Sequence, residues 1–308
     1  MAKIYFVPLQ HYNFFKIIVK HRSGFVNIVG KPNVGKSTLM NILVGQKLSI
    51  VTAKAQTTRH RIRGIINEED YQIIFSDTPG IIKPAYLLQN KMMDSVKSAM
   101  NDADIILYMV EANDEIYDEE IISKINSLDK PILLVINKID LIDQKKLENI
   151  VTEWRSKIKT KEIIPISATA NFNTSRILQS VIANLPEHPP YFPKDQFTDL
   201  PEKFFVAEII REKILLYYKK EIPYSVEVQV ESFKDEKKIV KIRAIIITER
   251  ETQKGILIGH KGVALKKVGT QARKGIEQFL GKQIYLELFV KVREGWRDNE
   301  MLLGDYGL

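Results

Sequence analysis

One nine-residue stretch constrains the fold of this chain more than any other. It follows an apolar run at 25–29 and precedes a helical apolar pattern at 39–48, and it consists of Gly30, Lys31, Pro32, Asn33, Val34, Gly35, Lys36, Ser37 and Thr38. A strand, a G-x-x-x-x-G-K-S loop and a helix in this order allow backbone N–H groups to surround a phosphate. Lys36 then supplies positive charge to the outer phosphates, and the Ser37 hydroxyl can ligate Mg²⁺. The alternative is an ordinary strand–turn–helix in which Gly and Lys occur by chance.

The residues that follow alternate between short apolar runs and helical patterns. Strands are predicted at 61–66, 71–75, 105–110, 132–136 and 163–166, and helices at 87–100, 119–128, 145–157 and 175–185. This alternation predicts an α/β domain, a mostly parallel sheet with helices on both faces. Ligands bind such sheets at the carboxyl ends of the strands, so residues at those ends are the candidate site residues.

The second of the predicted strands, at 71–75, ends in Asp77, Thr78, Pro79 and Gly80. An Asp at this end, beside a phosphate loop, can hold Mg²⁺ directly or through water. Gly80 can offer its N–H to a γ-phosphate and can move when that phosphate leaves. Alone, this tetrapeptide is also a common turn.

Two further motifs point to the base of a nucleotide. Asn137, Lys138 and Asp140 follow the strand at 132–136, and Ser167, Ala168 and Thr169 close the strand at 163–166. The Asp140 carboxylate can accept hydrogen bonds from N1–H and the 2-amino group of guanine, which adenine lacks, so such a site discriminates by ~10⁴ or more. Asn137 can hold the neighbouring loop, the Lys138 stem can cover the purine face, and a backbone N–H at 167–169 can meet guanine O6. Any one tetrapeptide could be a polar loop, but the ordered set predicts a guanine nucleotide pocket.

Together with Thr58, these segments resemble the five signature motifs of translation-factor-type GTPases. The string at 54–61, Lys-Ala-Gln-Thr-Thr-Arg-His-Arg, resembles the switch region of the Era family, bacterial GTPases with an RNA-binding tail. The resemblance implies that Mg²⁺ is held by Ser37, Thr58 and Asp77. Thr58 is preferred to Thr57 because it directly precedes Arg59-His60-Arg61. Lys36, Thr58 and Gly80 are the residues expected to act in hydrolysis.

Two features of the catalytic machinery stay open. Many GTPases carry Gln directly after the D-x-x-G motif, but this chain has Ile81, so no water-positioning residue is assigned. We expect slow intrinsic turnover, ~10⁻⁴ to 10⁻² s⁻¹, raised by RNA. In some related GTPases an Asn at the position of Asn33 helps to hold K⁺. The alternative is that Asn33 only shapes the loop.

The sequence changes character at 186–193, where four prolines predict a semi-rigid linker. The predicted organisation is an extension at 1–23 that is disordered, a nucleotide domain at 24–186, a linker at 187–202 and a second domain at 203–308. The second domain should contain a helix at 203–218, a hairpin at 226–233 and 239–248, a helix at 263–280 and a strand at 283–292. Residues 203–308 carry 21 Lys and Arg against 15 Asp and Glu, most of the chain's net charge of +8, which indicates a polyanionic partner.

A short motif in this second domain identifies the polyanion. Gly259, His260, Lys261 and Gly262 have the form of the GXXG loop of KH domains, which clamps about four nucleotides of a single strand. Residues 252–276 contain six Lys and Arg and no acid, among them Lys266, Lys267 and Arg273. A helix-capping turn with a solvated basic face is the alternative. The pattern favours an α+β KH domain of type II. The Era resemblance, which runs from about Gly24 to Leu308, implies binding of the single-stranded 3′ end of small-subunit (16S) ribosomal RNA and a role in small-subunit assembly.

The remaining features limit the other function classes. The chain has no Cys, which excludes disulfides and thiol chemistry, and no apolar run reaches the ~18 residues that span a bilayer. Residues 1–20 are basic and aromatic without the core of a signal peptide. We interpret them as a disordered tail or as a product of an early translation start, with a membrane-touching arm as the third reading. We therefore expect a cytoplasmic protein, with a monomer as the default because the sequence does not give the oligomeric state. The competing functions are a nucleotide-switched RNA-binding module in which hydrolysis is incidental, and a GTPase peripheral to the inner face of the cell membrane.

Overall fold

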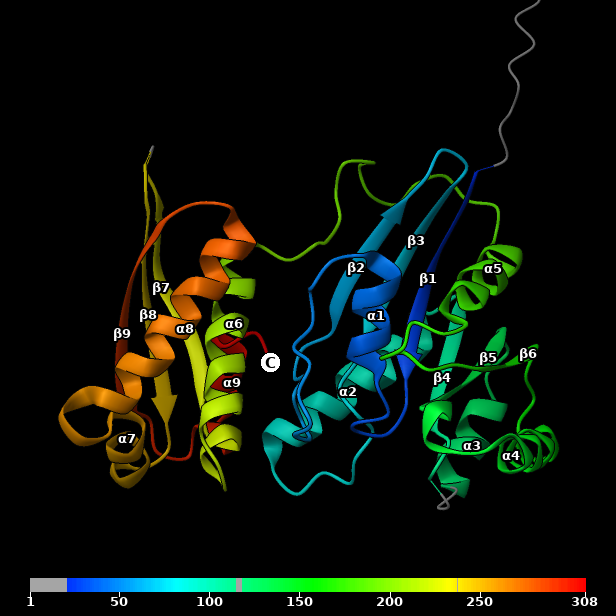
Figure 1. The fold of residues 1–308 in the computed structure, drawn as a ribbon, viewed down its shortest axis with the longest axis horizontal. Coiled ribbons are helices and arrows are strands. Elements are labelled where there is room, and N and C mark those ends of the chain that lie inside the picture. Colours follow the sequence, from blue (N-terminus) through cyan, green and yellow to red (C-terminus); the bar gives the residue numbers. More distant parts are fainter. Residues whose placement is uncertain (1–20, 115–117, 237) are drawn as a thin grey trace, which may run out of the picture.

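Two separate β-sheets organise the chain in the computed structural model, which describes residues 21–114, 118–236 and 238–308 (Figure 1). Most of the predicted N-terminal extension lies outside these ranges. Strand β1 (Arg22–Val29) begins two residues before the predicted boundary, and Arg22 pairs with Tyr71. The end of the predicted extension is therefore part of the first sheet.

The first sheet has six strands in the order β2-β3-β1-β4-β5-β6. The other strands are β2 (Ile62–Asn67), β3 (Tyr71–Asp77), β4 (Ile105–Glu111), β5 (Ile132–Asn137) and β6 (Glu162–Pro165). All neighbours are parallel except β2 and β3, which form an antiparallel hairpin. Strands β4 and β5 are apolar along almost their whole length because both faces of a parallel sheet are covered.

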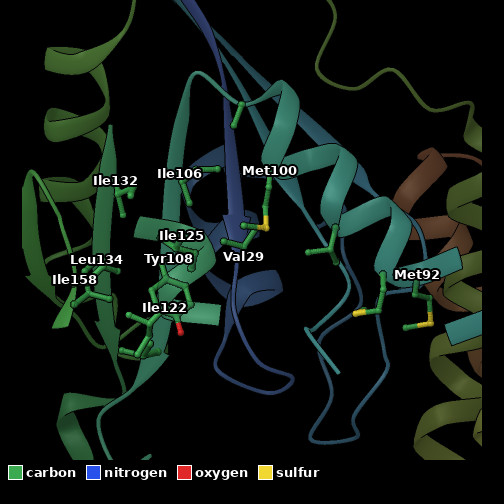
Figure 2. Packing of buried hydrophobic residues seen from close by; sticks show 14 of the residues in the cluster. Val29, Met92, Met100, Ile106, Tyr108, Ile122, Ile125, Ile132, Leu134 and Ile158 are labelled. Carbon is green, nitrogen blue, oxygen red and sulfur yellow. The ribbon is translucent and has the colours of Figure 1, made fainter. Parts of the chain in front are cut away.

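Helices cover both faces of this sheet, as the sequence predicts. They are α1 (Lys36–Val44), α2 (Leu87–Asp102), α3 (Glu119–Asn126), α4 (Gln144–Lys157) and α5 (Thr174–Asn184). On one face, a single buried cluster contains Met92 and Met100 of α2, Ile122 and Ile125 of α3, and Tyr108 of β4 (Figure 2). On the other face, α1 and α5 bury Leu39 and Ile177 against Ile28 and Leu107. The fold class predicted for this part is confirmed.

The second sheet belongs to a smaller α+β unit. Its elements are α6 (Glu202–Tyr217), β7 (Glu227–Asp235), β8 (Val240–Thr248), α7 (Glu251–Ile258), α8 (Val263–Leu280), β9 (Ile284–Val292) and α9 (Glu300–Asp305). Strand β8 pairs antiparallel with β7 and parallel with β9. Helices α6 and α8 bury Ile210 and Ala272 with Val228 and Ile242 of the sheet. Helices α7 and α9 were not predicted, because each is short and buries few residues.

The segment between the two units runs along the hairpin edge of the first sheet. Ile65 N donates to Phe197 O at 2.9 Å, and the Gln72 carboxamide accepts from Tyr191 N and Phe192 N. The linker is therefore bonded to the sheet over much of its length. Within the described ranges, no helix is both long and apolar enough to span a bilayer.

Candidate nucleotide-binding site and nucleic-acid groove

A cleft of about 570 Å³ opens at the carboxyl ends of the strands of the first sheet. This volume lies in the range of small-molecule sites. Residues from all five predicted motifs line it, namely Pro32, Asn33, Gly35, Lys36, Ser37, Thr38, Thr58, Thr78, Gly80, Asn137, Lys138, Asp140, Ala168 and Thr169. The other predicted residues lie in the same loops without lining the cleft. They are Gly30, Lys31, Val34, Asp77, Pro79 and Ser167.

The loop between β1 and α1 requires its two glycines. Gly30 has φ +155°, and a Cβ there would lie 2.2 Å from Met109 O. Gly35 has φ +103°, and a Cβ there would lie 2.3 Å from Asn137 Nδ2. Both contacts are too short for any side chain, so the motif's glycines follow from the packing of the loop against β4 and β5.

Lys36 is the buried cation of the cleft. Its Nζ donates to Gly30 O at 3.0 Å and to Lys31 O at 2.7 Å. Burial lowers the pKa of Lys36 to about 8, although the nearby Asp77 opposes this shift. A phosphate would offer this ammonium a charged partner in place of two neutral carbonyls.

Three oxygen-bearing side chains meet beside Lys36. Ser37 Oγ donates to Asp77 Oδ2 at 2.6 Å, and Thr58 Oγ1 lies 3.1 Å from both. Burial raises the pKa of Asp77, against the lowering effects of the Ser37 hydroxyl and Lys36. Asp77 Oδ1 is buried and has no hydrogen-bond partner among the described residues. A buried carboxylate with an orphaned oxygen, next to two hydroxyls, fits a hard divalent cation such as Mg²⁺.

The neighbouring Thr57 also lines the cleft, but its hydroxyl bonds within its own loop. Its hydroxyl donates to Lys54 O at 2.7 Å and lies 3.0 Å from Thr52 Oγ1. The structure therefore places Thr58, and not Thr57, beside Ser37 and Asp77.

The side chain of Asn137 joins two loops of the cleft. Its Nδ2 donates to Val34 O at 2.8 Å, and its Oδ1 accepts from Ala168 N at 2.9 Å. Asp140 lies on the short 3₁₀ turn Ile139–Leu141 and is exposed to the cleft. The Lys138 ammonium pairs with Glu111 at 2.6 Å. These residues form the part of the cleft where the base of a nucleotide is predicted to lie.

The Asp77–Gly80 segment is attached directly to the phosphate loop. Ile81 N donates to Gly30 O at 3.1 Å, and a Cβ at Gly80 would lie 2.7 Å from Pro32 Cα. The Ile81 side chain packs against the hydrophobic cluster around Tyr108. This apolar side chain cannot orient a water by hydrogen bonding, so it cannot take the role of the Gln that follows the D-x-x-G motif in many GTPases.

Residues of the second unit that were not predicted from the sequence also hold these loops. Arg59 donates to Glu227 at 2.8 Å and to Val226 O at 2.6 Å, and both charged side chains are buried. Asp298 Oδ1 accepts from Leu87 N at 2.9 Å and so caps α2, which has no side-chain cap of its own. The only sequence feature that pointed to these contacts was the string at 54–61, which contains Arg59, and it did not indicate which residues Arg59 contacts.

A second groove, of about 370 Å³, lies between α8 and β9. It is lined by Gly262, Leu265, Lys266, Gly269, Thr270, Arg273, Leu286 and Leu288. The predicted GXXG turn connects α7 to α8, and its two glycines have φ +70° and +77°. His260 and Lys261 are exposed on this turn. Lys267 instead places its Nζ 4.7 Å from the Tyr217 ring centroid, against α6 and outside the groove lining.

Comparison with known proteins matches both units. Residues 25–138 match the family described as 50S ribosome-binding GTPase, and residues 221–297 match the KH domain. The chain is 47% identical over 291 residues to GTPase Era of Caldanaerobacter subterraneus subsp. tengcongensis, covering 93% of this chain and 98% of that protein. It is 46% identical to GTPase Era of Geotalea daltonii, covering 92% and 97%.

Two solved structures agree with the whole architecture. One is an Aquifex aeolicus Era variant bound to GDP and AlF4⁻, and the other is Era in complex with MgGDPNP and nucleotides 1506–1542 of 16S ribosomal RNA. Each is 41% identical, covers 93% of this chain and 99% of the other, and gives a TM-score of 0.89. The agreement extends over both units.

Proposed function

Because this chain belongs to the Era family of GTPases, we propose that it hydrolyses GTP in the cleft of its first unit and binds ribosomal RNA with its second. The RNA is the single-stranded 3′ end of the small-subunit rRNA, and the role is in small-subunit assembly. The related Era structure holds nucleotides 1506–1542 of 16S rRNA, which supports this assignment.

The observation that carries the GTPase function is the meeting of Ser37, Thr58 and Asp77 beside Lys36. These side chains come from three segments far apart in the sequence, and they gather in one cleft with Asp140, which lies where the base is predicted. Ser37, Thr58 and Asp77 would hold Mg²⁺, which neutralises charge on the phosphates. A related Era structure contains MgGDPNP.

The chain's own residues provide the rest of the chemistry. The loop amides and Lys36 bind the phosphates, and Gly80 can offer its N–H to the γ-phosphate. Asp140 selects guanine, and Asn137 fixes the loop that presents Ala168 N–H to the base. Ile81 cannot hydrogen-bond the attacking water, so intrinsic turnover is slow and rises when RNA is bound.

The groove between α8 and β9 is the RNA site. Its floor is apolar, from Leu265 and Leu288, and its rim carries Lys266 and Arg273. This combination suits a single strand whose bases contact the floor and whose phosphates meet the basic rim. The exposed His260 and Lys261 add charge where the backbone turns.

Three finer proposals go with this function. Asn33 helps to hold K⁺; its Nδ2 bonds Ala53 O at 3.2 Å, and both residues line the cleft. The K⁺ proposal fails if replacing K⁺ by Na⁺ leaves the hydrolysis rate unchanged.

The protein acts as a monomer in the cytoplasm. Light scattering of the purified chain would test its oligomeric state. Contact with anionic lipid through residues 1–20 would be tested by liposome co-sedimentation with and without that segment.

Nucleotide selectivity tests the proposed function directly. Wild type should bind GTP and release phosphate with Mg²⁺, and it should reject ATP. Asp140→Asn replaces one acceptor by a donor, so we expect GTP to bind about 10³-fold more weakly and xanthosine triphosphate to bind better than GTP. Asp143→Asn is the control, because Asp143 caps α4 and does not line the cleft. Equal binding of ATP and GTP by wild type would contradict the proposal.

A further inference from the structure

The loop that carries Thr58 is held mainly by side chains. Residues 51–60 contain no helix or strand, and the described backbone–backbone hydrogen bonds outside regular elements include none from this segment. Within the first unit, side chains hold this segment: Asn33 and Thr57 donate to Ala53 O and Lys54 O, the Thr52 hydroxyl accepts from Lys54 N and lies beside that of Thr57, and Tyr86 donates to Gln56. None of these bonds reaches the backbone of Thr58, so its peptide unit is fixed only if other contacts hold it.

Those other contacts come from the second unit. The Lys54 ammonium donates to Leu215 O and Tyr218 O at the end of α6. Arg59 reaches Tyr224 O, Val226 O and Glu227. The loop therefore lies against α6 and the start of β7, on the side of the first unit that faces the second (Figure 1).

One contact of this set acts directly on the peptide unit of Thr58. Arg211 of α6 donates from Nη2 to the carbonyl oxygen of Thr57, and that carbonyl belongs to the peptide bond joining Thr57 to Thr58. Fixing this oxygen fixes the peptide plane from which the Thr58 side chain projects. Thr58 Oγ1 in turn lies 3.1 Å from Ser37 Oγ and from Asp77 Oδ2.

The Arg211 guanidinium is itself rigidly held. Glu208, one turn earlier on α6, accepts from Nε and Nη2 at 2.6 Å each. Arg211 is 1% exposed and Glu208 is 5% exposed. A bidentate, buried pair has one geometry, so the Nη2–Thr57 bond is set by the fold of the second unit.

We propose that Arg211 is a positioning residue for GTP hydrolysis, which holds Thr58 in place to complete the Mg²⁺ site only when the second unit is docked. This proposal rests on the GTPase function proposed above. Arg211 lies outside the cleft lining, so it acts through the peptide bond of Thr58 and not on the nucleotide. The phosphate loop, Asn137 and Asp140 make their contacts without it.

The experiment compares Arg211→Ala with wild type in full-length protein. A misplacement of about 1 Å in an active site can cost about 10²-fold in rate. We therefore expect kcat to fall by about that factor when Thr58 is displaced. The Mg²⁺ concentration that gives half-maximal hydrolysis, the Mg²⁺ midpoint, should rise at least fivefold. The Kd for GDP should stay within twofold, because the loop amides, Lys36, Asn137 and Asp140 are untouched.

Two matched variants separate positioning from general damage. Lys47→Ala removes another ion pair between the units, Lys47–Glu212 at 2.6 Å, which does not touch residues 51–60, so it should leave kcat and the Mg²⁺ midpoint unchanged. Arg211→Ala leaves the buried Glu208 carboxylate without its hydrogen-bonded partner and can unfold the protein. The double variant Glu208→Gln, Arg211→Gln removes that charge and the bond to Thr57 together, and should show the same kinetic change.

The outcomes are distinct. If wild type hydrolyses GTP and the folded double variant keeps its kcat and Mg²⁺ midpoint, the inference on Arg211 is overturned while the GTPase function stands. A merely structural role would lower the active fraction without moving the Mg²⁺ midpoint, and that result also overturns the inference. If wild type neither binds nor hydrolyses GTP, both proposals are wrong.

Discussion

Replacing Asn137 by Ala should weaken guanine nucleotide binding about 10²-fold. The change deletes two hydrogen bonds at once, from Nδ2 to Val34 O at 2.8 Å and from Ala168 N to Oδ1 at 2.9 Å. Asn137 is 3% exposed, so one acceptor and one donor lose their partners at a nearly buried position. Each buried unsatisfied group costs about 1–3 kcal/mol.

The two costs together amount to about 2–6 kcal/mol, and water entering from the cleft reduces them. We expect about 3 kcal/mol in total, because the cleft is open to solvent beside Ala168. Without Asn137, this free energy no longer stabilises the arrangement in which the phosphate loop and the 167–169 loop both face the nucleotide. Since 1.36 kcal/mol corresponds to a factor of ten, the loss corresponds to about 10²-fold in Kd.

The assay is titration with a fluorescent GDP analogue, together with urea unfolding. Asn126→Ala is the control, because Asn126 at the end of α3 also bridges two backbone groups, Lys157 O at 2.9 Å and Lys159 N at 2.8 Å, at the end of α4. It should lose less stability than Asn137→Ala, because its two bonds lie partly in solvent, and it should keep its affinity for GDP. The reasoning is refuted if Asn137→Ala binds GDP as tightly as wild type, or if Asn126→Ala weakens binding equally.

Three further predictions follow from other contacts. Lys266→Ala should weaken binding of a single-stranded RNA and reduce the slope of log K against log salt by about 1, whereas Lys267→Ala, which changes a residue outside the groove, should do neither; equal effects would contradict the assignment of the groove. Asp298→Ala should remove about 1 kcal/mol of capping and speed hydrogen exchange of the first amides of α2 about fivefold, and unchanged protection would rule out the cap. Burial raises the pKa of Glu208, but Arg211 outweighs it and holds that pKa below its ordinary 4.5. The stability that this carboxylate contributes is therefore fully present above pH 4.5, and it is lost as the pH falls through the lower pKa of the folded state. The free energy of urea unfolding of Glu208→Gln should depend less on pH in that window than that of the wild type.

The sequence predicted the fold well where local patterns decide it. The buried strands β4 and β5 are apolar because helices cover both faces, and such runs can be recognised without tertiary information. Helix α8 has the predicted bounds, because Gly262 and Gly281 flank it in left-handed conformations. The nucleotide motifs were also visible, because each lies within a few residues and at a strand end.

What the sequence could not give depends on residues far apart in the chain. Arg211 and Thr57, Arg59 and Glu227, and Asp298 and Leu87 are separated by more than 150 residues, and no periodicity encodes such pairs. The location of Lys267 could not be predicted from the sequence for a related reason. Lys266 and Lys267 are neighbours on α8, and neighbouring side chains of a helix point about 100° apart. Lys266 can therefore line the groove while Lys267 contacts α6.

The proposed function requires the GTPase cleft and the RNA groove to act together in one chain. The most direct measurement is multiple-turnover phosphate release from GTP, with and without a single-stranded RNA that copies the small-subunit rRNA 3′ end. Wild type should turn over slowly alone and several-fold faster with RNA, and the double variant Lys266→Ala, Arg273→Ala should lose the stimulation and keep the basal rate. RNA that binds wild type without changing the rate would contradict coupling and favour a nucleotide-switched binding module.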